Sequence, residues 1–379
     1  MQLETISYER GKGWSETPFP NLDSPSTLVL VFGAPEYGHD PAPIEELLAA
    51  YPHSTVVGCS TSGEILGDQM RDHSLSVAIA RFENTSVAMA VEPVTDSSQS
   101  EQVGHAMGSQ LAREGLRGVL VFSDGLKVNG TALVNGLNRA LPDDVTVTGG
   151  LAGDGDRFES TWIIAGAAPA TDRVVAVGLY GSSIRIGHGS KGGWDIFGPE
   201  RIITRSERNV LYELDGKPAL ELYKSYLGDR SEDLPSAALL FPLAIRSDEH
   251  DEFPNVRTIL AVDEATQSMT FAGDVPVGFR AKLMRASFEH LIDGAQGAAL
   301  MCADESATAT PTLSIAISCV GRRLVLGERV EDELESTLDV LSATTKQVGF
   351  YSYGELSPLQ SGPCVLQNQT MTLTTICES

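Results

Sequence analysis

The sequence predicts a mixed α/β chain of the α+β class that is divided into two domains. Short apolar runs rich in β-branched residues alternate with segments that have the composition and one-sided apolar pattern of helices. The chain has 379 residues, more than one typical domain, and 42% of them are hydrophobic, which suffices for two cores. We expect mixed sheets flanked by helices, in domains that span residues 24–215 and 216–379.

The elements follow from these patterns in chain order. Buried strands are expected at 27–32, 75–80, 118–122, 174–179, 258–262 and 311–319. Helices are expected at 43–51, 101–114, 131–137 and 332–341. The clearest helix start is Asp215–Ala219, because Pro218 lies near the first helical position, where its missing N–H costs nothing, and Gly228 can cap the end. The sequence shows no obvious repeat.

Composition restricts the partners and the location. The net charge of −24, without a basic patch, predicts that the protein binds neither nucleic acid nor an anionic membrane surface. No run approaches the roughly 20 apolar residues that span a bilayer, and the first residues carry an acid instead of a basic region. The five cysteines are scattered and odd in number, which fits a reducing compartment. We therefore predict a cytoplasmic protein.

The run Gly58–Glu64 places small residues and hydroxyls directly after an apolar strand. Glycines and small side chains let a backbone approach a bound molecule, and hydroxyls can donate hydrogen bonds to it. The run therefore indicates one wall of a ligand site. A tight turn that needs small residues only for packing is an equal alternative.

Several catalytic and cofactor motifs are incomplete. Gly187–Gly192 matches the G-x-G-x-x-G dinucleotide pattern, but no helix start follows it, and no P-loop is present. Ser62 stands where a nucleophile elbow needs glycine. Asp154 and Asp156 could hold a cation, although a solvated Asp-Gly turn is the stronger interpretation. Ordinary nucleotide and hydrolase sites are therefore disfavoured.

His188 is the histidine that best suits a metal. It lies between two glycines and near Trp194, and a single imidazole in an apolar pocket is enough to ligate haem iron. A turn histidine bonded to nearby backbone is the alternative. Cys59 reads as a small buried residue more readily than as a nucleophile, because no neighbouring base activates it.

The C-terminal part holds a second dense group in 349–355 and 364–372. Tyr351, Tyr353, Glu355 and Asn368 place donors and acceptors beside aromatic faces, as a polar small-molecule site requires. A strand hairpin whose tyrosines pack with their hydroxyls at the rim explains the same residues equally well.

These segments together resemble the FIST family, the F-box and intracellular signal transduction sensory proteins, over nearly the whole chain. The earlier part is similar to the FIST N domain and the later part to the FIST C domain. The segments that carry the likeness are 57–64, 149–154, 209–220, 318–322, 350–355 and 368–372.

The resemblance implies a sensory protein that binds a small ligand, usually proposed to be an amino acid, and is not an enzyme. One bacterial branch of similar proteins senses nitric oxide gas through haem and regulates a histidine kinase or a cyclic-di-GMP enzyme. No kinase, cyclase or F-box segment is recognised here, so we expect output to such a partner in trans. Relatives often carry His where this chain has Gln367, which puts a haem role at that position in question.

We place the ligand between the Gly58–Glu64 loop, His188 and the C-terminal tyrosine segment. His188 is the expected metal ligand, and a cysteine-dependent enzyme and an interaction scaffold stay open as alternatives. The expected site residues are His188, Cys59, Ser60, Thr61, Ser62, Glu64, Gly150, Asp154, Trp194, Tyr351, Tyr353, Glu355 and Asn368.

Overall fold

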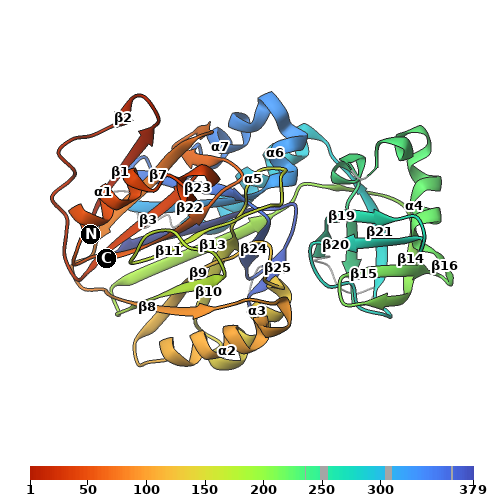
Figure 1. Ribbon diagram of the computed structural model, residues 1–379, viewed down its shortest axis with the longest axis horizontal. Helices are drawn as coiled ribbons and strands as arrows, with labels where there is room; N and C mark the ends of the chain where they lie inside the picture. Colours follow the sequence, from red (N-terminus) through yellow and green to blue (C-terminus); the bar gives the residue numbers. More distant parts are fainter. Residues whose placement is uncertain (235, 248–254, 304–309, 360–361) are drawn as a thin grey trace.

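The computed structural model describes residues 1–234, 236–247, 255–303, 310–359 and 362–379, which form two bodies of unequal size (Figure 1). The larger body, here called the core, contains three six-stranded sheets built from both ends of the chain. The smaller body, here called the module, is formed by the chain from β14 to β21 and contains the remaining sheet. Strands and helices are mixed throughout, which confirms the predicted α+β class.

The first core sheet comes mainly from the N-terminal segment. Its strands, in spatial order, are β11 (Ile163–Ala165), β4 (Thr55–Ser60), β3 (Thr27–Gly33), β7 (Ser74–Arg81), β1 (Gln2–Glu9) and β2 (Gly13–Trp14). β3 and β4 are parallel, and α1 (Ala42–Ala50) connects them. Every residue of β3 is buried, as its unbroken apolar run predicts for a central strand.

The second core sheet repeats this arrangement. Its strands are β25 (Val365–Gln367), β24 (Gly354–Ser357), β10 (Thr146–Leu151), β9 (Leu116–Ser123), β12 (Arg173–Tyr180) and β8 (Ser86–Pro93). Two helices, α2 (Ser100–Leu111) and α3 (Gly130–Ala140), pack against each other beside it (Figure 1). α3 begins after Asn129, whose side chain accepts a hydrogen bond of 2.9 Å from the Ala132 N–H.

The third core sheet joins the C-terminal strands to segments from the first half of the chain. Its strands are β13 (Ile184–Lys191), β26 (Met371–Glu378), β22 (Thr312–Cys319), β23 (Thr345–Ser352), β5 (Glu64–Leu66) and β6 (Gln69–Arg71). The helices associated with it are α5 (Phe288–Cys302), α6 (Val320–Leu326) and α7 (Val330–Leu338).

The same strand order therefore occurs three times, although the sequence shows no obvious repeat. Each sheet has a parallel pair, β3 with β4, β9 with β10 and β22 with β23, followed by two antiparallel strands. Each parallel pair also receives an antiparallel strand that follows the parallel pair of a different sheet: β11 joins β4, β24 joins β10 and β5 joins β23. This exchange links the three sheets in a closed cycle.

The centre of the core shows the same threefold correspondence. Gly58, Gly149 and Gly349 occupy equal positions, and a Cβ on any of them would lie 1.7–1.9 Å from a carbonyl oxygen of the neighbouring parallel strand. Glycine is required because only a residue without Cβ allows this approach. Between the sheets, the Phe32 ring lies 5.5 Å from Phe122 and 4.8 Å from Phe350, measured between centroids.

The module is a curved antiparallel sheet with one main helix. Its strands are β18 (Asn255–Arg257), β17 (Leu243–Arg246), β21 (Arg280–Arg285), β14 (Asp195–Glu207), β15 (Val210–Leu214), β20 (Ser268–Phe271) and β19 (Ile259–Asp263), with β16 (Lys217–Pro218) paired to β15. The predicted helix is confirmed as α4 (Ala219–Leu227), which Gly228 caps at a φ of 59°. The expected division between residues 215 and 216 does not coincide with a division between sheets, because β14 and β15 pair with β21 and β20.

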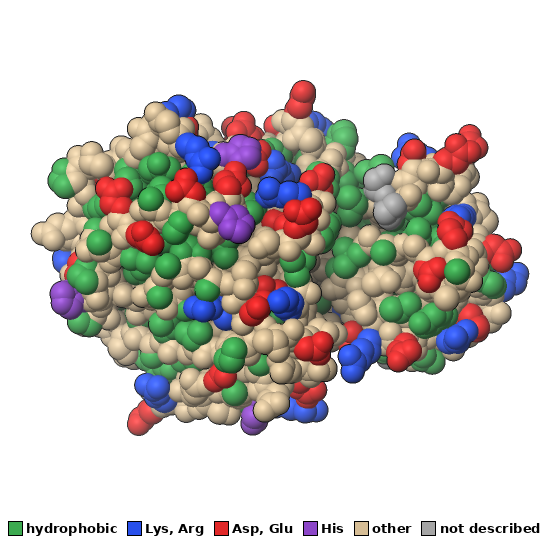
Figure 2. Space-filling model, in the orientation of Figure 1, with side chains coloured by type: hydrophobic (Ala, Val, Ile, Leu, Met, Phe, Trp, Pro, Cys, Tyr) green, Lys and Arg blue, Asp and Glu red, His purple; other side chains and the backbone are tan. Residues whose placement is uncertain are grey.

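Two further observations concern the surface and the helices. On the face shown in Figure 2, acidic and basic side chains are interspersed, and Lys and Arg form no continuous patch. Within the part of the chain that the structure describes, no helix is long and apolar enough to cross a membrane.

Candidate functional site

The loops that follow the three parallel strand pairs meet at one end of the core. These are the segments 60–64, 151–155 and 351–355, and they contain most of the site residues expected from the sequence. Their backbones are joined cyclically by hydrogen bonds from Ser62 N to Tyr351 O at 2.8 Å, from Gly153 N to Ser60 O at 3.0 Å and from Tyr353 N to Leu151 O at 3.2 Å. The fold thus brings three sequence-distant motifs into one cluster, here called the loop cluster.

Asp154 organises the loop that crosses this cluster. Its carboxylate accepts hydrogen bonds of 2.9 Å from the backbone N–H groups of Phe158, Glu159 and Ser160 and a further bond from the hydroxyl of Tyr353. Burial acts to raise the pKa of Asp154, but these hydrogen bonds outweigh it and lower the pKa below its usual value. The residue is 2% exposed, so it is a buried loop anchor instead of a solvated turn.

No cation site forms here. Within the described residues, no group of three His, Cys, Asp or Glu side chains could hold a metal ion. Ser62 contributes to the same loop, because its Oγ accepts a hydrogen bond of 3.0 Å from Gly155 N.

Glu64 and Glu355 occupy matching positions in two of the loops. Glu64 accepts hydrogen bonds from the Thr61 hydroxyl and from the N–H and Oγ of Ser74, the latter two at 3.0 and 2.8 Å. Glu355 accepts bonds from Ser352 Oγ at 2.7 Å and from the N–H and Oγ1 of Thr370 at 3.2 and 3.0 Å. Burial raises the pKa of Glu64 to about 7 and that of Glu355 to about 8. Both side chains tie a loop to the point where a later strand begins, β7 at Ser74 and β26 after Thr370.

The remaining small residues of the cluster are packed inside the core. Ser60 Oγ accepts a hydrogen bond of 3.1 Å from Trp162 N, and a Cβ on Gly150 would lie 2.9 Å from Ile317. Cys59 is fully buried, and burial raises the pKa of its thiol well above the ordinary value. Since the thiolate is the nucleophilic form, this environment disfavours the cysteine-dependent enzyme.

Tyr351 belongs to a buried polar network behind the cluster. Its hydroxyl donates a hydrogen bond of 2.7 Å to Glu333, which also forms an ion pair of 2.7 Å with Arg322. Both charged side chains are fully buried. Arg323, the residue after Arg322 in α6, instead reaches the loop cluster and donates a hydrogen bond to the carbonyl oxygen of Ser62.

Asn368 lies near the loop cluster, since a Cβ on Gly354 would be 3.7 Å from its amide nitrogen, and Trp194 contacts the residue that follows it. Asn368 is fully buried, and neither polar atom of its side-chain amide has a hydrogen-bond partner among the described residues. The Trp194 indole donates a hydrogen bond of 2.8 Å to the carbonyl oxygen of Gln369.

His188 lies outside the loop cluster. It is in the middle of β13, opposite Thr374 of β26, and burial lowers the pKa of its imidazole. Its Nδ1 is buried and has no partner among the described residues, as a free ligand nitrogen would be. Neither of the two cavities described below is lined by His188 or Trp194, and the haem assignment stays a prediction.

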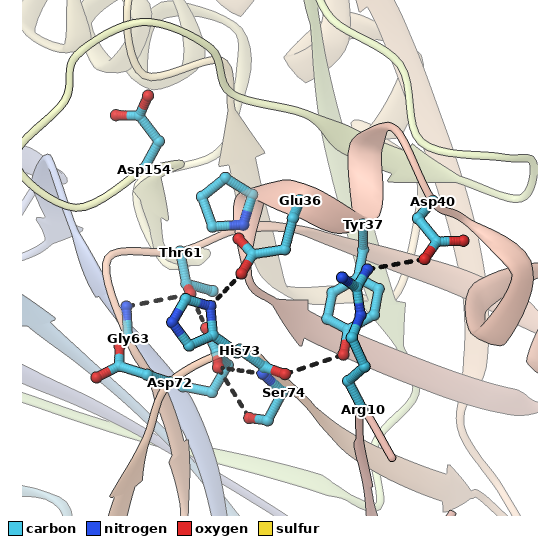
Figure 3. A network of polar contacts seen from close by, with 12 residues as sticks. Arg10, Glu36, Tyr37, Asp40, Thr61, Gly63, Asp72, His73, Ser74 and Asp154 are labelled. Carbon is cyan, nitrogen blue, oxygen red and sulfur yellow. Dashed lines mark hydrogen bonds and ion pairs between the residues drawn. The ribbon is translucent and has the colours of Figure 1, made fainter. Parts of the chain in front are cut away.

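A charged cleft of about 580 Å³ lies beside the loop cluster. It is formed by the turn between β6 and β7, by the loop that Asp154 anchors and by α6 with the residue that caps it. The lining residues are Met70, Asp72, His73, Asp154, Gly155, Asp156, Arg157, Val320, Arg323, Leu324 and Gly327. Figure 3 shows that Asp72 and His73 are adjacent on one segment, whereas Asp154 comes from a different loop.

Ion pairs hold two walls of the cleft. Arg323 donates to both carboxylate oxygens of Asp72, at 2.9 and 2.6 Å. His73 pairs with Glu36, which raises the pKa of the imidazole and favours its charged form (Figure 3). Arg157 donates from Nε to the carbonyl oxygen of Asp154 at 2.7 Å. Neither Arg157 nor Asp156 forms an ion pair with any residue that the structure describes, although Arg157 is near enough to Glu36 to interact with it electrostatically. Both residues line the cleft.

The sequence did not identify most of these charged residues. Arg157 lies three residues after the Gly149–Asp154 segment, and Arg323 belongs to the Arg322-Arg323 pair, so each had a local signal. Asp72 and His73 had none, because a two-residue turn between short strands carries no motif. The positive φ of His73, 57°, marks that turn only in the structure.

Comparisons with known proteins show which protein family the chain matches. A family model described as the FIST N domain matches residues 27–217, and one described as the FIST C domain matches residues 219–358. No curated protein matches the chain. Among solved structures, it is similar to a cyanuric acid hydrolase from A. caulinodans, with 11% sequence identity, a TM-score of 0.34 and coverage of 99% of this chain and 98% of that one.

Proposed function

We propose that this chain, which belongs to the FIST family, senses a small metabolite that carries both a carboxylate and an ammonium group, as amino acids do. FIST domains are sensory ligand-binding domains. The observation that carries the proposal is the charged cleft, in which Arg157 and Asp156 form no ion pair with any described residue.

The chemistry of the cleft suits a zwitterion. The guanidinium of Arg157 keeps its terminal N–H groups for a carboxylate, because only Nε is engaged by Asp154. The carboxylate of Asp156 accepts hydrogen bonds from an ammonium group. Asp72 and Glu36 are already paired with Arg323 and His73, so they hold the walls and do not compete for the ligand. The volume of about 580 Å³ is within the range of small-molecule sites.

Calorimetric titration of the full chain with each common amino acid tests the proposal. At least one should bind saturably, and Arg157→Gln should weaken it about tenfold or more, because a charge-assisted hydrogen bond is lost. Arg117→Gln is the matched control, since Arg117 is an exposed arginine of β9 that does not line the cleft. Absence of binding by every amino acid, or equal affinity in the Arg157 variant, would contradict the proposal.

Output is proposed to pass to a separately encoded histidine kinase or cyclic-di-GMP enzyme. A ligand changes a partner only if the partner distinguishes the ligand-bound from the ligand-free state, and the two affinities must then be coupled reciprocally. The test compares partner activity with empty and with loaded protein. Equal activity in both states would remove the signalling role and leave ligand binding intact.

A haem-based nitric oxide sensor is the second candidate, and the unpartnered Nδ1 of His188 favours it. His188 would hold the haem iron through its imidazole, and the iron would supply the binding of a diatomic gas. Absorption spectra of protein expressed with haem supply decide the question. A Soret band that His188→Ala abolishes or shifts supports this candidate, and a protein without a Soret band rejects it.

A further inference from the structure

A second cavity, of about 290 Å³, lies where the module meets the core. It is separate in character from the charged cleft, because most of its wall is apolar. The core contributes Leu126, Leu151, Phe158 and Tyr353, and the module contributes Leu260 and Phe271. The position between two bodies is a common one for small-molecule sites.

An aromatic pair forms one wall of this cavity. The ring of Phe158 stacks on that of Tyr353, with centroids 4.4 Å apart and planes inclined by 13°. Phe158 has a φ of 54° and is 47% exposed, so the loop holds a large apolar ring at the surface in the left-handed region. An exposed aromatic face beside a cavity favours a planar apolar ligand.

Two polar side chains of the wall have hydrogen-bonding capacity that the described part of the chain does not use, although the charge of Arg208 interacts with Asp96. Thr258 is only 4% exposed, and its buried Oγ1 has no hydrogen-bond partner among the described residues. Arg208 lines the same cavity, is exposed to solvent and forms no ion pair there. A buried hydroxyl without a partner is uncommon in proteins, and a ligand atom would satisfy it.

We propose that this cavity binds a small aromatic monocarboxylate. Its ring packs against the Phe158 and Tyr353 pair, its carboxylate pairs with Arg208, and the hydroxyl of Thr258 hydrogen-bonds to a polar atom of the ligand. The volume of about 290 Å³ is at the lower end for ligand sites, so a molecule of about ten non-hydrogen atoms fits best. The proposal concerns a different cavity from the charged cleft and does not depend on it.

Phenylacetate is the probe for this class. Calorimetric titration of the full chain should give saturable binding, whereas acetate, which lacks the ring, and benzyl alcohol, which lacks the charge, should bind at least about tenfold more weakly. Binding of acetate or benzyl alcohol as tight as that of phenylacetate would overturn the assigned ligand class.

Three variants locate the site. Arg208→Gln should weaken phenylacetate about tenfold or more, and Phe158→Ala and Thr258→Val should weaken it about three- to tenfold each. Arg117→Gln is the matched control and should leave the affinity unchanged. Because Arg208 is exposed, its variant is expected to fold even if a change at Phe158 disturbs the loop. No saturable binding, or unchanged affinity in Arg208→Gln and Thr258→Val, overturns the proposal.

Discussion

The ring of Phe158 stacks on the ring of Tyr353 at a centroid distance of 4.4 Å, while the Tyr353 hydroxyl bonds to the carboxylate of Asp154. The loop between Asp154 and Phe158 therefore forms a wall of both cavities. Asp154–Arg157 line the charged cleft, and Phe158 lines the cavity at the module. This loop therefore connects the two proposed sites physically, as does Val320, which lines both cavities.

Tyr353→Phe should loosen this loop without changing the aromatic stack. The variant loses the hydroxyl that bonds to Asp154 and to the carbonyl oxygen of Gly155, and we expect a loss of about 1–2 kcal/mol in the free energy of unfolding. The pKa of Asp154 should rise, because one of the hydrogen bonds that lower it is gone. Urea denaturation and a pH titration of the carboxyl by NMR measure both effects.

Tyr212→Phe is the control for this variant, since no hydrogen bond of the Tyr212 hydroxyl is present within the described residues. Its stability should be that of the parent protein. An unchanged Asp154 pKa in Tyr353→Phe would show that the three backbone N–H groups alone hold the carboxylate.

The buried pair of Arg322 and Glu333 should be costly to break from one side. Glu333→Gln leaves a buried guanidinium without its counter-charge, and we expect a loss of about 3–5 kcal/mol. Removing both charges in Arg322→Met with Glu333→Leu should recover part of that loss, because neither charge is then buried alone.

Chemical denaturation of the single and double variants gives these values. The exposed pair of Arg139 and Glu101 is the comparison, and Glu101→Gln should lower the free energy of unfolding by less than about 1 kcal/mol. A single Glu333→Gln variant as stable as the parent would be incompatible with a charged pair in the folded state.

The three central glycines should tolerate no side chain. In Gly349→Ala, the new Cβ would lie 1.8 Å from the Ala316 carbonyl oxygen, so the parallel strands must separate, and we expect a loss of about 3 kcal/mol or more. Gly216→Ala is the control, because its φ of 73° is strained for alanine but no atom lies within 4 Å. It should cost about 1 kcal/mol. Thermal denaturation separates the two, and equal melting temperatures would refute the close-approach argument.

Local elements of the fold could be predicted, but their partners could not. The helix Ala219–Leu227 has a proline before it and a glycine after it, and the structure confirms it. The run at 311–319 predicts a strand, which the structure confirms as β22, yet nothing in it indicates that the neighbouring β23 also pairs with Glu64–Leu66 from the first half of the chain. Hydrophobic periodicity reports burial of one segment and contains no information on which segment covers it.

The threefold structural repeat could not be recognised from the sequence for a related reason. Gly58, Gly149 and Gly349 are the shared requirement, because the repeat depends on a close backbone approach there, while the side chains next to them differ. The loop cluster could be expected from its small residues, hydroxyls and tyrosines. The charged cleft could not, because Asp72, Arg157 and Arg323 belong to sequence-distant segments that meet only in the folded chain.

Stability should fall between pH 5 and pH 8, and Glu355 should account for part of the fall. Burial raises the pKa of its carboxyl to about 8 from an ordinary value of 4.5. Between these values, the folded state keeps a proton that the unfolded state has lost. The contribution of Glu355 to the free energy of unfolding is therefore complete below pH 4.5 and disappears as pH rises through 8, at up to about 1.4 kcal/mol per pH unit.

In Glu355→Gln, whose side chain does not titrate, the decrease of the free energy of unfolding with pH should be less steep, as urea denaturation at several pH values can measure. Glu45→Gln, at an exposed position of α1, should keep the parent slope, and an equally steep slope in the Glu355 variant would show that Glu355 is already ionised in the folded protein.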